Sequence, residues 1–339
     1  EGFVMQQADG HSLHSEGLPW WLLDSLPQGY LGRAFAQRFA REHTDPGLPA
    51  RLSHWSDDQR LLALLQAGED LPGNLLLGEE ARAAFLAAAQ RPAIAEQERG
   101  LAYARLARAV ERGDVAGSSA AGEQPKFTAC IQGPAGLQHV IVKFSASDTH
   151  AVSERWRDLL LAEHLALRSL SRGGVSAAQT RIVDHEGQRF LEIARFDRVG
   201  ATGRRALHSL AALDAEFVGQ ARLDWPQLVQ ALAQTRPPCA TTQAAEQTAL
   251  LWAYGQLIAN TDMHHGNLSF MAEHGRPYAL APAYDMLPMA FAPGAGGTLD
   301  RLPPPARIAA QVPAPTWHRA LALAQEFERA LHAALDNGA

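Results

Sequence analysis

The fold of this chain is decided by the stretch Asn260-Thr261-Asp262-Met263-His264-His265-Gly266-Asn267 together with Asp285, which follows a strand expected over 278–281. An aspartate, an asparagine five positions later and a second aspartate beyond a strand are the residues that phosphoryl transfer requires. The first carboxylate accepts the proton of an acceptor hydroxyl, the amide holds Mg²⁺, and the second carboxylate bridges the metal to the phosphates. The pattern predicts these roles for Asp262, Asn267 and Asp285.

The two histidines of this stretch are less decisive than its carboxylates. His264 and His265 are adjacent, so they do not present a chelating pair on one helix face, and a metal-dependent hydrolase built on them and Asp262 is a distant alternative. We expect one histidine to pack under the loop as a neutral hydrogen-bonding strut, and we include His264 among the catalytic residues. Asp262 alone could also be a helix-capping residue, but capping requires neither Asn267 nor Asp285.

A run of small residues lies upstream and leads into a strand: Ser118-Ser119-Ala120-Ala121-Gly122-Glu123-Gln124-Pro125-Lys126. Small residues let backbone N–H groups approach phosphates closely. The run matches neither of the common glycine-rich phosphate motifs. By itself it is more often a flexible turn than a phosphate-binding loop.

Lys143 strengthens the phosphate interpretation, because it lies in the apolar strand 140–144. A charged lysine in a buried strand requires an anionic partner, either a phosphate or a helix carboxylate, and the following helix offers Glu154, Asp158 and Glu163. The alternative is an edge-strand lysine whose ammonium group reaches solvent. Lys126 and Lys143 are the only lysines among 30 Lys and Arg residues, which suggests that these two positions need a compact point charge.

The composition excludes several classes of protein. A net charge of −6 and a pI near 6.2, without blocks of like charge, argue against a dedicated nucleic-acid or membrane-surface protein. Cys130 and Cys239 have no metal-type spacing and fit a reducing compartment. No apolar run approaches the roughly 18 residues of a membrane span. We therefore expect a cytoplasmic protein with no membrane segment.

Periodicity and turn residues predict the order of the elements. We expect a sheet-rich segment followed by a helical one, with the polar motifs at their junction, which indicates an α+β, two-lobed, protein-kinase-like fold. The predicted units are 1–112, an N-terminal subdomain; 113–200, a sheet-containing N-lobe; and 201–339, a mainly helical C-lobe. We expect a helical pattern near 31–39 from the spacing of Leu31, Phe35 and Phe39, a helix over 56–66, helices within 79–112 interrupted at Pro92, and helical segments over 150–172, 207–255 and 318–336. The expected strands include two pairs, 127–131 with 140–144 and 180–183 with 189–193, and the short strands 74–77 and 278–281. The stretch 288–316 is expected to be a Pro-rich surface connection.

Taken together, these motifs resemble the HipA family of serine/threonine kinases, the toxins of toxin–antitoxin pairs, and most of all its YjjJ-type branch. The resemblance covers most of the chain and follows the family order. Segments 23–27 and 68–73 are similar to the N-terminal subdomain, 119–126 to the phosphate loop and 261–269 to the catalytic loop; Arg195-Phe196-Asp197-Arg198 is a further shared motif.

The resemblance implies ATP and Mg²⁺ as cofactors and a nucleotide site whose parts come from three segments. Lys143 would contact the α- and β-phosphates, and the backbone of a hinge between the lobes would meet adenine. Ser119 occupies the register of an autophosphorylated serine, with Ser118 adjacent, and its phosphate would repel those of ATP. The implied nucleotide-binding residues are Ser118, Ser119, Ala120, Ala121, Gly122, Gln124, Lys126, Lys143, Ala194, Arg195, Phe196, Asn267 and Asp285.

The implied partners are a protein substrate, for instance a component of translation, and either an antitoxin or an upstream helix-turn-helix region for DNA. Two other functions stay open. Asp-x-His-x-x-Asn also occurs in lipid and small-molecule kinases. Ala194, where the family commonly has glutamate, and Glu154, which is one position out of register, also allow a nucleotide-binding pseudokinase.

Overall fold

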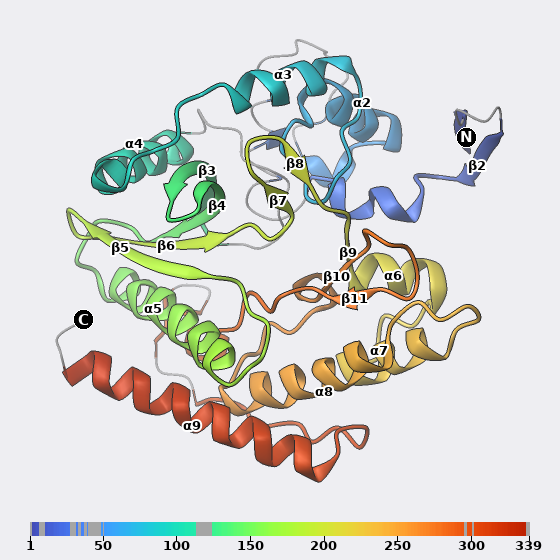
Figure 1. The fold of residues 1–339 in the computed structure, drawn as a ribbon. Helices are drawn as coiled ribbons and strands as arrows, with labels where there is room; N and C mark the ends of the chain where they lie inside the picture. The colour runs from blue at the N-terminus through green and yellow to red at the C-terminus, as the bar shows by residue number, and fades with distance from the viewer. Residues whose placement is uncertain are drawn as a thin grey trace.

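The computed structural model describes residues 2–6, 11–27, 51–112, 124–294, 297–299 and 302–336, together with Gly32, Phe35, Ala36, Phe39 and Pro49. It has the expected α+β, two-lobed architecture (Figure 1). Part of the predicted helical pattern near 31–39 and the whole run 113–123 lie outside the described residues. None of the described helices is long and apolar enough to cross a membrane.

The N-lobe is a four-stranded antiparallel sheet of order β3-β4-β6-β5, which confirms both predicted strand pairs. Its strands are β3 (Lys126–Gly133), β4 (Gly136–Phe144), β5 (Thr180–His185) and β6 (Gln188–Ala194). Side chains alternate between the two faces of a strand. Val140, Val142 and Phe144 of β4 therefore share one face, and Lys143 points to the other.

Helices cover both faces of this sheet (Figure 1). On one face, Tyr103 of α4 (Arg99–Glu111) packs with Phe127, Phe144 and Phe190. On the other, Leu160 of α5 (Ala151–Arg172) packs with Leu191 and Ile193. Because Lys143 lies on the α5 face, its partner has to come from that helix or from the C-lobe.

The C-lobe is helical, as expected for 207–255, but the helical part does not begin at Leu207. The stretch begins with strand β9 (Leu207–Ser209) and contains three helices, and local hydrogen bonds define their starts. Ser209, Asp224 and Thr241 each accept a backbone N–H at a helix N-terminus, and Asp224 forms a capping box with Gln227. The helices are α6 (Leu210–Phe217), α7 (Trp225–Gln234) and α8 (Thr242–Leu257).

A second sheet of order β11-β10-β9 supports the predicted catalytic loop. β10 (Ser269–Met271) begins directly after that loop and pairs with β9 and with β11 (Ala279–Leu280), which is shorter than the predicted strand 278–281. The last helix, α9 (Ala314–Asp336), starts before 318 because Pro315 lies in its first turn, where no intrahelical N–H bond is needed. The major core joins α5, α7, α8 and α9.

The remaining elements belong mostly to the N-terminal part. The predicted helix 56–66 is α2 (Asp57–Ala67), which begins at the capping box of Ser56 and Gln59. Segment 74–77 is not a strand, because it has no pairing partner among the described strands. The others are β1 (Gly2–Gln6), β2 (Ser12–Glu16), η1 (Trp20–Ser25), η2 (Leu52–His54), α3 (Glu79–Ala89), η3 (Glu96–Glu98), β7 (Arg198–Val199), β8 (Gly203–Arg204), η4 (His265–Asn267) and η5 (Met289–Phe291).

A buried ionic cluster joins the N-terminal part to the end of the N-lobe sheet. Asp197 accepts hydrogen bonds from Arg195 at 2.8 and 2.9 Å, from Arg198 at 2.7 Å and from the backbone N–H of Gly73 at 3.0 Å. Asp70 pairs with the same two arginines. Burial alone would raise the pKa of Asp197, but the two arginines outweigh it and hold this pKa well below its usual range.

Candidate functional site

The candidate catalytic loop, residues 260–267, is shaped by two asparagine side chains that bond its backbone. Asn260, which follows α8, accepts the N–H of Asp262 at 3.1 Å and donates to the carbonyl of Asp285 at 3.2 Å. Asn267 donates its amide N–H to the carbonyl of Asp262 at 2.8 Å. Asn260 therefore connects the two predicted aspartates. Asn260 is the first residue of the motif, but the spacing of the motif did not predict this positioning role for its side chain.

The histidines have different roles in the loop. His265 is the predicted strut, because its Nε2 lies 2.8 Å from the carbonyl oxygen of Leu223. The Nδ1 of His264 accepts the N–H of Gly266 at 3.0 Å, and the carbonyl of His264 accepts the indole N–H of Trp225 at 3.2 Å. His264 is close enough to Asp262 to act on it electrostatically. Whether His264 contributes to catalysis stays a prediction.

Asp262 is exposed as a residue, but its carboxyl group is partly desolvated and its pKa lies above that of an ordinary aspartate. Burial is the largest cause that raises the pKa of Asp262, and the negative charge of Asp285 adds to it. His264, Lys143 and a hydrogen bond with Asn267 oppose that shift. A carboxylate with a raised pKa is a stronger proton acceptor, and perturbed groups of this kind cluster at functional sites.

Lys143 is held between two carboxylates. Its Nζ lies 2.7 and 2.8 Å from the two oxygens of Glu163 and 2.6 Å from Oδ1 of Asp285. Glu163 has no solvent exposure, and the Lys143 side chain is 5% exposed. Burial alone would lower the pKa of Lys143, but Asp285 and Glu163 outweigh it and hold that pKa above its ordinary value.

The structure thus identifies the helix acid that the sequence left open. Glu163 binds Lys143, whereas Glu154 lies at the start of α5, is 55% exposed and pairs with Arg157. Asp158 is also exposed. Nine residues, two and a half helical turns, separate Glu154 from Glu163, and only the packing of α5 against the sheet selects between them.

Lys126 is the cross-strand neighbour of Lys143 and not a residue of the preceding loop. It is the first residue of β3, is 3% exposed, and pairs in register with Lys143. Burial raises the pKa of Glu163 overall, and the positive charge of Lys126 opposes that shift; the same charge helps to lower the pKa of Asp285. Two lysines and two carboxylates give the cluster no net charge, which is how four ionised groups can share a buried site.

Asp285 has a left-handed backbone, with φ of +52°. Such a conformation costs a non-glycine residue about 1–3 kcal/mol and is concentrated at functional sites. The cluster holds the residue in place: burial alone would raise the pKa of Asp285, but Lys143 and Lys126 outweigh it and lower this pKa. The preceding Tyr284 donates its hydroxyl to the carbonyl of Gly266 at 2.8 Å, which joins Asp285 to the catalytic loop.

The predicted hinge and phosphate loop are described only in part. The N–H groups of Ala194 and Arg195 donate to Gln179 and His139, and the Arg195 side chain belongs to the buried ionic cluster. Adenine would therefore have to use carbonyl groups of 194–196 or the amide of Phe196, whose ring packs on Tyr284. Ser118, Ser119, Ala120, Ala121 and Gly122 lie outside the described residues.

The donor set fits magnesium and phosphate. Asn267 uses its amide nitrogen within the loop, so its amide oxygen is left to bind a ligand. Asp285 supplies carboxylate oxygen. Mg²⁺ prefers oxygen ligands of these two kinds. On the phosphate side, the amide nitrogen of Gln124 is buried and has no hydrogen-bond partner among the described residues. An anionic oxygen beside Lys126 would satisfy that donor.

A cavity of about 340 Å³ adjoins Asp262 and could hold an acceptor side chain. The catalytic loop forms one wall, and part of the Pro-rich stretch forms the opposite wall. The backbone N–H of Arg307 donates to the side chain of Gln256 at 2.9 Å, which fixes that wall on α8. The predicted surface connection is thus part of the site. The lining residues are Trp252, Gln256, Asn260, Thr261, Asp262, Met263, His264, Pro304, Pro305 and Arg307.

Comparisons with known proteins agree with this geometry. Residues 1–86 match the family described as YjjJ-like toxin, middle domain, and residues 118–335 match the HipA-like C-terminal domain. Toxin YjjJ of Escherichia coli (strain K12) is 40% identical over 321 residues, which are 94% of this chain and 71% of that protein.

Two solved structures are also similar. A chain of the complex of the Shewanella oneidensis MR-1 toxin–antitoxin proteins HipA and HipB with operator DNA matches with a TM-score of 0.57 at 16% identity. The match covers 99% of this chain and 88% of that one, which shows a shared fold. The Helicobacter pylori proinflammatory kinase CtkA matches with a TM-score of 0.38 at 15% identity, over 49% of this chain and 54% of that one.

Proposed function

This chain belongs to the HipA-like toxin family, and we propose that it is an ATP- and Mg²⁺-dependent kinase that transfers the γ-phosphate to a serine or threonine of a protein. The observation that carries the proposal is the Lys143–Glu163–Asp285 cluster beside the loop of Asp262 and Asn267. These are the charged groups that phosphoryl transfer uses to bind phosphates and to accept a proton. A fold alone would not support this function.

In the proposed reaction, each residue of the site has one task. Asp262 accepts the proton of the acceptor hydroxyl in the adjoining cavity. Lys143, oriented by Glu163, contacts the α- and β-phosphates, and Lys126 adds positive charge beside it. Asn267 and Asp285 would hold Mg²⁺, which when bound neutralises charge on the phosphates. We further propose that the protein acts in the cytoplasm and that an antitoxin or an upstream DNA-binding region regulates it.

Autophosphorylation provides the direct test. With γ-labelled ATP and Mg²⁺, we expect wild type to incorporate label at Ser119. We expect Ser119→Ala to remove that label, because the family resemblance places this serine at the autophosphorylated position. Ser118→Ala is the matched control and should still label. Phosphopeptide mapping by mass spectrometry measures the result. Label confined to a site outside 113–123 would contradict regulation by phosphorylation of Ser119.

The acceptor class is tested in the same assay. Transfer of label to serine in a protein fraction favours the proposed function, and transfer to phospholipid or a metabolite favours a lipid or small-molecule kinase. Nucleotide binding with Mg²⁺ but without any transfer would identify a regulatory nucleotide-binding module. Each outcome excludes the other two as the main activity.

The rate of phosphate transfer should depend on pH through Asp262. A general base acts when it is deprotonated, and the pKa of Asp262 is raised by burial and by Asp285. We therefore expect activity to fall with decreasing pH, with a midpoint above the ordinary 3.8 of aspartate. His264→Ala, which removes a group that lowers this pKa, should move the midpoint to higher pH. Single-turnover rates across the pH range test both shifts; an unmoved midpoint in His264→Ala would contradict the assignment.

A further inference from the structure

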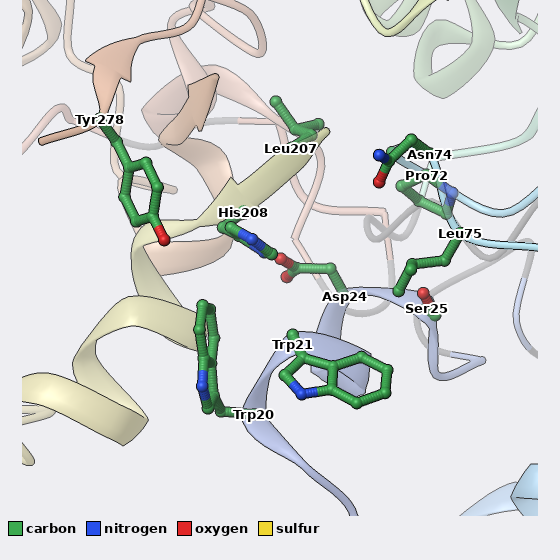
Figure 2. Close-up of a pocket in the computed structure, with 11 residues that line it drawn as sticks. Trp20, Trp21, Asp24, Ser25, Pro72, Asn74, Leu75, Leu207, His208 and Tyr278 are labelled. Carbon is green, nitrogen blue, oxygen red and sulfur yellow. The ribbon is translucent and has the colours of Figure 1, made fainter. Parts of the chain in front are cut away.

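A second cavity, of about 280 Å³, lies where the N-terminal part meets the C-lobe (Figure 2). Its walls come from η1, from segment 72–75, from β9 and from Tyr278 beside β11. Ligand pockets for drug-sized molecules are about 300–1,000 Å³, so this one has the size for a single side chain or a small molecule. The lining residues are Trp20, Trp21, Asp24, Ser25, Pro72, Gly73, Asn74, Leu75, Leu207, His208 and Tyr278.

The chemistry of this cavity is aromatic with one acidic group. The ring of His208 lies between Trp20, at 4.7 Å between ring centroids, and Tyr278, at 5.8 Å. The carboxyl group of Asp24 points from η1 toward the ring of His208 (Figure 2). Aromatic faces and a carboxylate are both groups that attract a cation.

Asp24 has no cationic partner among the described residues. Its Oδ2 accepts the backbone N–H of Ser209 at 2.7 Å, and no described lysine or arginine lines the cavity. His208 does not supply the missing charge, because burial lowers its pKa to about 4 and keeps it neutral at pH 7. Burial also raises the pKa of Asp24, against the opposing hydrogen bonds of Ser209. Asp24 is half-buried. A partly desolvated carboxylate without a counter-ion is costly, and a bound cation would reduce that cost.

We propose that this cavity is a binding site for a guanidinium group, supplied by an arginine side chain or by a small guanidinium compound. The planar ion can stack on an aromatic ring of the cavity while it donates to the carboxylate of Asp24, which a compact ammonium group does less well. The site is separate from the ATP and acceptor sites, so the inference does not depend on the kinase proposal.

The site is connected to the catalytic loop through β9 and β10. Ser209, which donates to Asp24, pairs with Ser269 in the sheet. The hydroxyl groups of Ser269 and Tyr284 are 2.7 Å apart, and Tyr284 donates to Gly266 of the loop. A ligand on Asp24 would therefore be linked through this chain of contacts to the loop that carries Asp262 and Asn267, which fits a regulatory partner better than a substrate.

Calorimetric titration of the full chain tests the proposal. The probes are N-acetyl-arginine methylamide, agmatine as the small-molecule source, and N-acetyl-citrulline methylamide as the uncharged isostere. We expect one of the two guanidinium probes to bind at least tenfold more tightly than the citrulline probe, and Asp24→Asn to remove that difference. Stronger binding of the arginine derivative indicates a protein side chain, and stronger binding of agmatine indicates a free ligand.

Asp24→Asn keeps an oxygen that can accept the N–H of Ser209, so the variant should fold, and its unfolding midpoint is measured alongside. Glu80→Gln, an exposed residue of α3 with the same change in charge, is the matched control and should bind like wild type. Absence of binding by either guanidinium probe, equal binding of citrulline, or unchanged affinity in folded Asp24→Asn would overturn the proposal. Trp20→Leu, which removes one aromatic wall, should also weaken binding.

Discussion

Replacing Asp262 with alanine is expected to lower the rate of phosphate transfer by about 10²–10⁴-fold, the contribution typical of a positioned general base. The folded structure should be retained, because two hydrogen bonds hold the loop through the backbone of Asp262, and alanine keeps that backbone. The backbone N–H donates to Asn260, and the carbonyl accepts from Asn267. Single-turnover transfer of γ-labelled phosphate measures the rate.

A matched control separates the loss of the base from a general loss of charge. Asp158→Ala removes an exposed carboxylate of α5 and should leave the rate unchanged. ATP binding to Asp262→Ala should also remain close to that of wild type, since the phosphate contacts are assigned to Lys143. Labelling by Asp262→Ala at the wild-type rate would show that this residue is not the base.

Replacing Lys143 with methionine is expected to destabilise the protein by about 3–5 kcal/mol, the cost of leaving buried charges without a partner. The change leaves the carboxylates of Glu163 and Asp285 facing one another, with Lys126 as the remaining lysine that acts on both. The double variant Lys143→Met/Glu163→Gln, which removes one of those charges, should recover much of the loss. Urea unfolding at pH 7 measures the three free energies of unfolding.

The pH dependence of that loss has a definite sign. In Lys143→Met, the buried Glu163 should have a pKa above its unfolded value, so its contribution is unfavourable at high pH and is relieved as the pH falls through the raised pKa. The single variant should therefore approach wild type on acidification. A loss that is independent of pH, or a double variant as unstable as the single one, would mean that the charges are not the cause.

Lys143→Arg tests the phosphate contact without removing the charge. A guanidinium group has a planar fork that does not match a point-charge site between the two carboxylates. We expect stability closer to wild type than in Lys143→Met, but a large loss of phosphate transfer. Near-normal transfer would count against the phosphate role of this residue.

The sequence located most of the candidate catalytic residues because their spacing is local. Asp262 and Asn267 are five residues apart on one loop, and a hydrogen bond from the Asn267 side chain to the backbone of Asp262 fixes their relation. The hairpin of β3 and β4 was also predictable, because alternating apolar residues and a turn specify its register. In both cases the interactions lie within a short segment.

The partner of Lys143 could not be found in this way. Glu154, Asp158 and Glu163 all lie on α5, and the sequence offers no reason to prefer one. The angle at which α5 packs on the sheet brings Glu163 to Lys143 and leaves Glu154 exposed. The acceptor cavity was missed for a similar reason, since 304–307 meets Asp262 only through the packing of a segment about 40 residues distant.

What the sequence determined by itself was the spacing of the candidate catalytic residues, the order of the main helices and strands and the position of the only two lysines. The tertiary structure decided that these lysines are cross-strand neighbours in one neutral cluster, and that Asp24 lies in an aromatic cavity behind the catalytic loop. The physical reason is range: backbone hydrogen bonds and side-chain periodicity act over a few residues. The charge balance of a buried site depends instead on groups that only the packed core brings together.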